Sequence, residues 1–334
     1  MDNKYDLIVI GSGIGGLTVA SLSSKIFKKK VLVLEKHFKV GGFTHTFKRK
    51  NYIWDVGVHY IGDMHDNSVI KKVFDFITDK NLKWSKMPDL FEKFVYPDFT
   101  FDVYSNKDKY RIDLIKRFPN EENNIKNYFS DLKKAVNCLT PYFIIGTFSP
   151  KIRQFLLPIL LRTSSFYSMT TKEYLDKNFQ DEILKALLTS QWGDYGLTPE
   201  YSSFLIHSII VNHYLNGAYY PIGGSHKIAE SIIPNIKNNG GDIFTSHGVK
   251  EIIIKNHTAI GVKVAHKIGD KVEELEFYAP KIISNAGAYN TFKRLIPNNY
   301  SNKFINDLEK LNNQGTSHIN IFLGLKDAKL GFKR

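Results

Sequence analysis

The chain has 334 residues, of which 43% are hydrophobic, and a formal net charge of +13. This composition excludes a disordered chain and indicates a globular protein of about two domains. The positive charge suits anionic partners, but the basic clusters are short. We therefore expect mainly a solvated basic surface, then peripheral contact with an anionic membrane, and no nucleic acid.

The single cysteine, Cys138, excludes an internal disulfide and fits a reducing compartment, so we expect a cytoplasmic location. The first residues contain no long apolar segment of the secretory kind. The most apolar run, residues 155–161, is much shorter than the roughly 20 residues of a membrane span. It either dips into one leaflet of a membrane or forms a buried helical turn, and we favour the buried turn.

The first predicted unit is a strand, a glycine-rich turn, a helix and a second strand. Residues 7–10 are a continuous apolar run, as in a buried parallel strand, and residues 31–34 repeat this pattern before ending at Glu35. The glycines between the strands have G-x-G-x-x-G spacing and stand at Gly11, Gly13 and Gly16. Together these features predict a dinucleotide-binding unit.

The physical role of each residue explains the spacing. Gly11 permits a tight turn, Gly13 lets the backbone approach a diphosphate, and Gly16 lets the helix lie close to the strand. The amino end of the helix presents free N–H groups to the phosphates. Glu35 stands where a carboxylate accepts the ribose hydroxyls. This unit alone leaves NAD and FAD open, since both contain adenosine diphosphate.

A glycine pair follows in "GGFTHTF", and "WDVGVHYIG" comes soon after it. With the preceding motif and "LEK", these residues resemble FAD-dependent flavoproteins of the phytoene desaturase and amine oxidase type. They are most similar to the retinol saturase and carotenoid isomerase branch. The resemblance implies an α/β fold, in which a Rossmann-like FAD-binding domain with a parallel sheet carries an inserted α+β substrate domain. FAD is the implied cofactor, with NAD(P) as a candidate electron donor or acceptor.

The resemblance also implies which residues meet the cofactor. A side chain at Gly42 would collide with extended FAD, the backbone at Val249 would contact adenine, and residues 55–62 would lie beside the flavin or the substrate opening. The predicted cofactor-binding residues are Gly11, Ser12, Gly13, Gly16, Glu35, Lys36, Gly41, Gly42, Phe43 and Val249. No catalytic residue is predicted, although His59 and Tyr60 are candidate proton donors, and no metal site is expected.

The two predicted domains are each discontinuous in the sequence. Residues 1–90 and 218–298 are expected to bind FAD, and residues 91–217 and 299–334 to form the substrate domain. The pattern predicts a small antiparallel sheet over 91–114, helices over 121–215 and a helix over 225–237. Further strands are expected at 242–246, 249–254, within 279–287 and at 317–326.

The predicted function is that of an FAD-dependent oxidoreductase. It would desaturate, saturate or isomerise double bonds in an apolar isoprenoid, retinoid or carotenoid substrate. Two alternatives stay open: an amine-oxidase-like flavoprotein and an inactive nucleotide-binding remnant. Family members continue well beyond Arg334, so we expect a truncated product, a half completed by a second chain, or a fragment.

Overall fold

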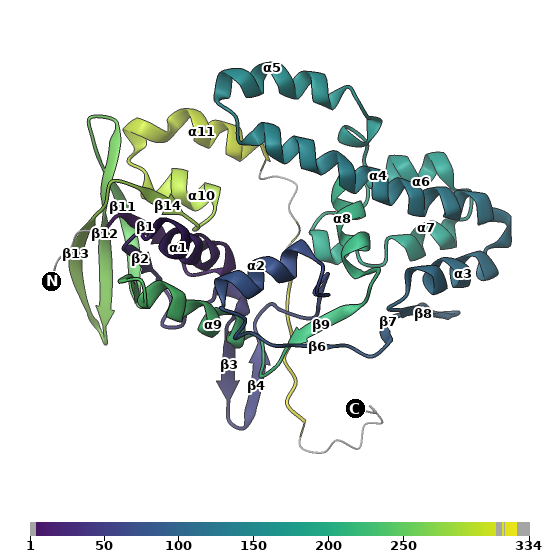
Figure 1. Cartoon of the computed structure of the whole chain (residues 1–334), viewed down its shortest axis with the longest axis horizontal. Coiled ribbons are helices and arrows are strands. Elements are labelled where there is room, and N and C mark those ends of the chain that lie inside the picture. The colour runs from purple at the N-terminus through teal and green to yellow at the C-terminus, as the bar shows by residue number, and fades with distance from the viewer. Residues whose placement is uncertain (1–4, 312–315, 317, 326–334) are drawn as a thin grey trace.

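The computed structural model describes residues 5–311, 316 and 318–325 (Figure 1). A four-stranded parallel sheet with the order β10-β2-β1-β14 forms its centre. Its strands are β1 (Leu7–Ile10), β2 (Val31–Leu34), β10 (Asp242–Phe244) and β14 (Ile282–Ser284). The predicted α/β fold with a parallel sheet is therefore confirmed.

Both faces of this sheet are buried, which explains why β1 and β2 are apolar at every position. One face, with Val9 and Val33, packs against α1 (Ile14–Phe27) and α9 (His226–Lys237). The other face, with Ile8 and Leu32, packs against a three-stranded antiparallel sheet. That second sheet contains β11 (His247–Lys255), β12 (Thr258–Ile268) and β13 (Lys271–Tyr278).

A second hydrophobic core lies in the helical part of the chain, on the right of Figure 1. It contains Leu114, Ile125, Tyr128 and Phe204, all buried. Its elements are β7 (Leu90–Val95), β8 (Thr100–Tyr104), α3 (Lys107–Arg117), α4 (Glu122–Gly146), α6 (Thr171–Asn178), α7 (Glu182–Leu188) and α8 (Phe204–Tyr214). The proposed domain boundaries stay a prediction.

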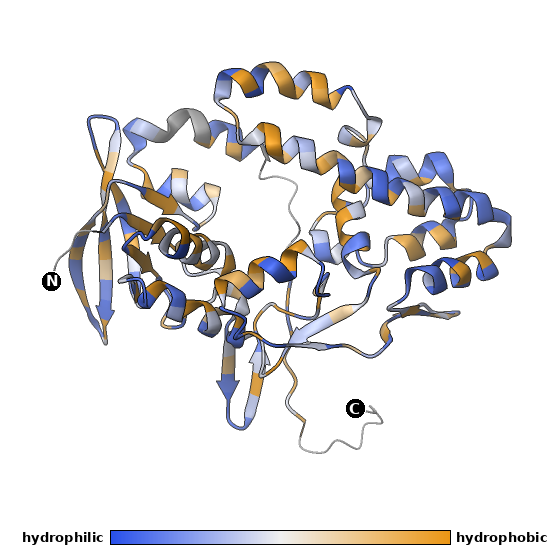
Figure 2. Ribbon diagram, viewed as in Figure 1, coloured by the Kyte–Doolittle hydropathy of each residue, from blue (hydrophilic) through white to orange (hydrophobic). Residues whose placement is uncertain are grey.

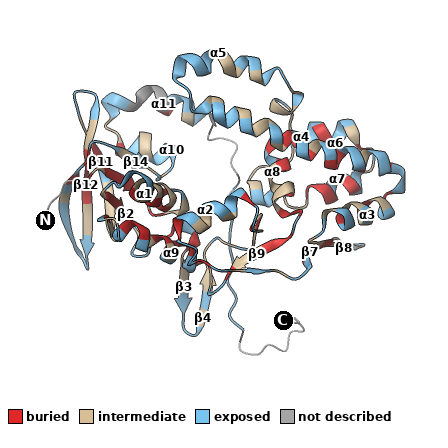
Figure 3. Cartoon of the chain, viewed as in Figure 1, coloured by how far each residue is buried: buried red, intermediate tan, exposed pale blue. Residues whose placement is uncertain are grey.

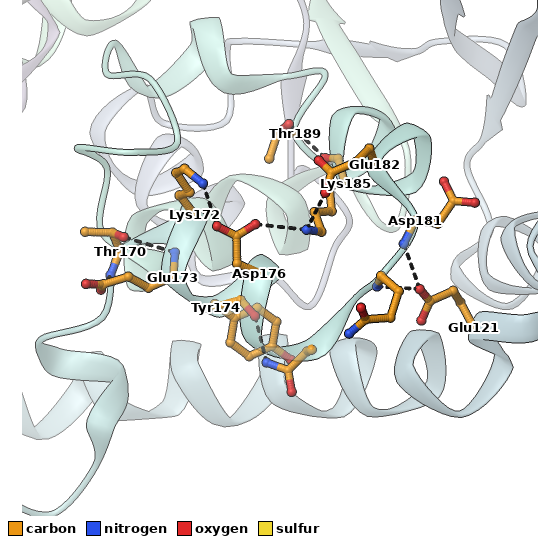
Figure 4. Close-up of polar contacts among 12 residues, drawn as sticks. Glu121, Thr170, Lys172, Glu173, Tyr174, Asp176, Asp181, Glu182, Lys185 and Thr189 are labelled. Atoms are coloured by element: carbon orange, nitrogen blue, oxygen red, sulfur yellow. Dashed lines mark hydrogen bonds and ion pairs between the residues drawn. The ribbon is translucent and has the colours of Figure 1, made fainter.

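Polar contacts hold the turn between α6 and α7 against the start of α4 (Figure 4). The Glu121 carboxylate accepts hydrogen bonds from the backbone N–H groups of Gln180 and Asp181, at 2.6 and 3.0 Å. Thr170 begins α6 with a capping box, in which its side chain and that of Glu173 bond each other's backbone. Each of these contacts satisfies backbone donors at a helix end.

A mixed set of short elements connects the two cores. Strand β9 (Ala218–Pro221) lies between β5 (Ile61–Gly62) and β6 (Trp84–Lys86), and β3 (Thr46–Arg49) forms a hairpin with β4 (Tyr52–Asp55).

The remaining helices of the described residues are η1 (Gly42–Thr44), α2 (Val69–Ile77), η2 (Pro119–Glu121), α5 (Pro150–Leu161), η3 (Ser165–Tyr167), η4 (Trp192–Tyr195), α10 (Ala288–Asn290), η5 (Thr291–Leu295) and α11 (Asn298–Leu311).

The predicted sheet over 91–114 is wrong in its last third. Strands β7 and β8 form the expected hairpin, but α3 begins at Lys107. The Asn106 side chain accepts a hydrogen bond from the backbone N–H of Lys109 at 3.0 Å, which caps the helix. Tyr110 and Leu114 then share its buried face. The alternation that suggested a strand is the i, i+4 spacing of a helix.

The strand expected at 317–326 is also wrong over the described residues 318–325, which contain no strand. This segment contacts the β3–β4 hairpin through side chains instead. The Tyr52 hydroxyl donates to the Leu325 carbonyl at 2.8 Å, and the ring centroids of Phe47 and Phe322 lie 4.8 Å apart. Residues 317 and 326 lie outside the described part of the chain.

Candidate functional site

A cleft of about 760 Å³ lies at the carboxyl ends of β1 and β2. Parallel α/β sheets commonly bind ligands at this edge. Eight of the predicted cofactor-binding residues line it: Gly11, Gly13, Glu35, Lys36, Gly41, Gly42, Phe43 and Val249. Residues far apart in the sequence therefore meet around one cavity large enough for a dinucleotide.

The glycine-rich turn begins α1 with bare backbone. Gly11 has a φ of +94°, which favours glycine, and a Cβ at Gly16 would lie only 2.1 Å from the Gly11 carbonyl oxygen. Gly13 is the N-cap of α1, and within the described part of the chain no side chain caps this end. The first turn also contains no acidic residue. Its N–H groups and positive dipole can therefore receive an anion from the cleft.

Ser12 and Gly16, the other two predicted residues, lie behind the lining. Ser12 is fully buried, and its backbone N–H and hydroxyl donate to Glu35 Oε2 at 2.9 and 2.6 Å. The backbone N–H of His37 donates to Glu35 Oε1 at 2.8 Å. A carboxylate can accept about four hydrogen bonds, so Glu35 can still accept one more from a ligand. These contacts fix the orientation of the carboxylate.

The Gly41-Gly42 pair brings the chain back against the first glycine turn. The Gly41 N–H donates to the Ser12 carbonyl at 3.0 Å. Gly42 has a φ of +55°, and a Cβ there would lie 3.0 Å from the Gly13 Cα. The sequence suggested that a side chain at Gly42 would meet the cofactor, but the protein's own backbone already excludes one.

Several lining residues were not predicted, and Asn285 has the most specific position. Its side chain lies 3.2, 2.9 and 3.2 Å from where Cβ atoms at Gly13, Gly15 and Gly16 would stand. Asn285 follows β14 in the segment "ISNAG", at the end of the region 279–287 in which the sequence predicted a strand. The other unpredicted lining residues are Ile10, Ile14, Gly15, Leu34, Thr44, Lys250, Ala286, Asn290, Arg294 and Leu295. No sequence motif marked Arg294 or Lys250, the added cations.

The candidate proton donors His59 and Tyr60 lie outside this lining. The Tyr60 ring packs on Phe91 and Tyr214 of the helical part. His59 Nε2 lies 3.5 Å from Asp194 Oδ1. The hydrogen bond that His59 donates to Asp194 raises the pKa of His59 above its ordinary value, despite opposing burial. His59 therefore holds a proton more readily than a free histidine does.

His213 lies near His59 and Asp194, and its pKa shifts in the opposite direction to that of His59. Burial lowers its pKa. Its Nε2 accepts a hydrogen bond from the Gly62 N–H at 2.8 Å, which requires an unprotonated nitrogen. A Cβ at Gly62 would lie 1.9 Å from the His213 carbonyl oxygen, so only glycine permits this close approach of the two segments.

The fold and the cleft define an α/β protein with a Rossmann-like dinucleotide-binding domain. Residues 9–77 match the family model of the NAD(P)-binding Rossmann-like domain. The fold is also similar to that of a putrescine oxidase redesigned in its cofactor binding, with a TM-score of 0.57 and 14% identity. That similarity covers 87% of this chain and 60% of the oxidase.

Among characterised proteins, the chain is 35% identical to all-trans-retinol 13,14-reductase of Danio rerio over 98% of its length. It is 26% identical to the chloroplastic prolycopene isomerase of Arabidopsis thaliana over 97% of its length. The match covers 55% of each relative, so the chain spans about half the length of these proteins. The predicted resemblance to the retinol saturase and carotenoid isomerase branch is confirmed.

No helix among the described residues is long and apolar enough to cross a membrane.

Proposed function

We propose that the cleft binds FAD and that the protein is an FAD-dependent oxidoreductase acting on carbon–carbon double bonds of an apolar substrate. The observation that carries this proposal is the bare backbone of two glycine segments facing one cavity at the amino end of α1. The similarity to retinol reductases and prolycopene isomerases supports a retinoid, carotenoid or other isoprenoid substrate. NAD(P) remains a candidate electron donor or acceptor.

The residues present fit FAD. Gly13 and the free N–H groups of α1 would receive the diphosphate, and Glu35 would accept a ribose hydroxyl. Val249 would lie against the adenine, and the cations Lys36 and Arg294 would balance the phosphate charge. A bound flavin supplies hydride transfer to or from carbon, which the protein's side chains cannot perform.

The chain's own contribution to the reaction would be binding, exclusion of water and control of protons. Saturation of a double bond requires a proton donor; His59 lies outside the cleft lining but stays the candidate, because Asp194 favours its protonated form. Desaturation and isomerisation need no such donor. We therefore keep saturation, desaturation and isomerisation as three forms of the same proposal.

An amine-oxidase-like activity is the second candidate, and its support is the shared fold with putrescine oxidase. Retinoids, carotenoids and amines offered in parallel under reducing and oxidising conditions would separate the two. Turnover of amines alone would favour the second candidate. An inactive remnant, the third candidate, would be colourless and would take up no added FAD.

Gly13→Val tests the cofactor proposal most directly. Valine would place two methyl groups in the cleft beside Asn285, where a Cβ already lies 3.2 Å from Asn285 Nδ2. We expect the unchanged protein to show flavin absorbance at about 375 and 450 nm. The variant should lose about 90% of this absorbance.

Gly146→Val is the matched control for this experiment. Apart from its own turn of helix and its chain neighbours, no described atom lies within 4 Å of the position of its Cβ, and Gly146 stands in the helical part of the chain. The control should keep its yellow colour. Equal flavin content in Gly13→Val and the unchanged protein, with both folded by circular dichroism, would reject the cofactor proposal.

A further inference from the structure

The chain forms a projecting helical hairpin from residues 136–161, the second half of α4 together with α5, which we call the α4–α5 hairpin. The buried residues of α4 end at Ala135, and α5 has none. All residues of this hairpin are described, and none of them is buried. Figure 3 shows the hairpin without red, in contrast to the first half of α4. The buried helical turn expected at 155–161 is therefore wrong.

The composition of the hairpin does not suit exposure to water. Figure 2 shows α5 as largely hydrophobic. Between 42% and 71% of each of six large apolar residues is exposed: Phe143, Ile144, Phe148, Ile152, Phe155 and Ile159. Soluble proteins rarely leave a contiguous apolar patch of this kind uncovered, so the hairpin has the properties of a binding surface.

The charged residues of the hairpin and of the sequence on either side of it are all of one sign. Between Asp131 and Glu173 the sequence contains no acidic residue and six basic ones: Lys133, Lys134, Lys151, Arg153, Arg162 and Lys172. Lys151, Arg153 and Arg162 are exposed, and none of them forms an ion pair with a described residue. Lysines elsewhere, such as Lys185, pair with nearby carboxylates. Unpaired cations beside exposed apolar side chains favour an anionic, apolar partner.

We propose that the α4–α5 hairpin docks on the surface of an anionic lipid membrane. The 12 residues of α5 would extend about 18 Å, well below the roughly 30 Å of a bilayer's hydrocarbon layer, so the helix would lie in the interface. Its apolar side chains would enter the boundary between headgroups and acyl chains. Arg153, Lys151 and Arg162 would meet the lipid phosphates.

A second copy of this chain suits the hairpin less well. Pairing two hairpins would bring basic side chains against basic side chains, without a carboxylate from either hairpin between them. The lipid proposal stands independently of the FAD proposal, because it depends on neither the cleft nor the substrate. An apolar substrate dissolved in the same membrane would make the two proposals compatible.

Sedimentation with vesicles tests this proposal on the 334-residue chain. Vesicles of phosphatidylcholine alone and with about 30% phosphatidylserine are compared at low and high salt, since screening weakens the attraction of basic residues to anionic lipid. We expect binding to the anionic vesicles at low salt. Replacing Lys151, Arg153 and Arg162 by Gln should weaken that binding by about a hundredfold.

Matched controls separate this surface from general basicity. Replacing Lys267, Lys271 and Lys281, three exposed lysines of the opposite part of the chain, removes the same charge. That control should bind within about threefold of the unchanged protein, because these residues lie outside the hairpin. The contribution of the apolar side chains to vesicle binding is tested with the double variant F155Q and I159Q. Its control is the double variant I268Q and V272Q, which changes an exposed apolar pair in β12 and β13.

Phe155→Trp reports where the hairpin lies. Its added fluorescence should shift to shorter wavelength with anionic vesicles and be quenched by brominated acyl chains. The proposal is overturned if no vesicle binds, or if both charge-removal variants lose binding equally. It is also overturned if sedimentation velocity shows a dimer that F155Q with I159Q dissolves, since a second copy would then cover this face.

Discussion

A single methyl group at Gly16 would meet the Gly11 carbonyl oxygen at 2.1 Å, well inside contact distance. The requirement for glycine there comes from how α1 packs on the end of β1, before any ligand is considered. Gly13 differs, because its Cβ would meet only the Asn285 side chain, at 3.2 Å. Gly16 is therefore needed for folding, whereas the missing side chain of Gly13 leaves space in the cleft.

We predict that Gly16→Ala destabilises the protein by about 2–4 kcal/mol, because either α1 or the turn must shift. The measurement is urea unfolding followed by circular dichroism. Gly146→Ala is the control, since its Cβ would enter open space and alanine is the better helix former, by about 0.5–1 kcal/mol. Equal stabilities of the two variants would contradict this account of Gly16.

His59 and His213 should titrate on opposite sides of 6.5, the ordinary pKa of histidine. The hydrogen bond to Asp194 raises the pKa of His59, and burial lowers that of His213. The charged His59 contact thus stabilises the fold fully below pH 6.5, and this contribution is lost as pH rises through its raised pKa. The His213 contribution has the opposite sign and is lost as pH falls.

NMR titration of the histidine ring protons measures both pKa values. Asp194→Asn should bring the pKa of His59 back toward 6.5 or below it, because burial then acts with less opposition. His213 should change little, since burial and not Asp194 dominates its shift. A His59 pKa that Asp194→Asn leaves unchanged would exclude the contact as its cause.

Among the elements, α4 has two halves with different surroundings. Its first half packs into the core of the helical part through Ile125, Tyr128 and Leu132. Its second half continues into the exposed α4–α5 hairpin. The first half is anchored by Glu121, which stands directly before α4 and bonds the turn leading into α7. That single carboxylate connects three helices.

We predict that Glu121→Gln lowers stability by about 1–3 kcal/mol, since an amide accepts the Gln180 and Asp181 N–H groups less strongly than a carboxylate. Burial tends to raise the pKa of Glu121, but hydrogen bonds from Asn124, Gln180 and Asp181 outweigh it, and the net shift is downward. The contribution is therefore present above the unfolded pKa near 4.5 and lost as pH falls through the lowered value.

Unfolding free energies at several pH values between about 3 and 7 check this prediction. The difference between the unchanged protein and Glu121→Gln should shrink toward the acid end. Glu173→Gln is a suitable comparison, because its side chain is exposed and forms only a capping box. A difference between Glu121→Gln and the unchanged protein that grows with acid would disprove the assignment.

Over the described part of the chain, the buried hydrophobic residues form two separate regions, one around the parallel sheet and one in the helical part (Figure 3). Only the first surrounds the cleft. A ligand of the cleft should therefore stabilise the region around the sheet more than the helical region. This is the physical basis of the proposed division into a cofactor domain and a substrate domain.

We predict that FAD at about 100 times its dissociation constant stabilises the sheet region by about 2.7 kcal/mol. Calorimetry should show one transition moving to higher temperature while another stays, if the two regions unfold separately. Adding FAD to Gly13→Val should move neither transition. If FAD raised the transition temperature of Gly13→Val as much as that of the unchanged protein, FAD would bind outside the cleft.

The sequence by itself determined the strand–glycine–helix–strand unit and its terminal acid, because this unit depends on neighbouring residues and on backbone freedom at Gly11, Gly13 and Gly16. Only the tertiary structure determined which residues from other parts of the chain contact that unit. Asn285 reaches the glycines only because β14 pairs with β1, and no local pattern encodes that pairing. Likewise, periodicity shows that residues 150–161 are helical and apolar, whereas their exposure depends on which elements pack nearby. Local backbone chemistry can be read along the chain, but burial is a property of the packed molecule.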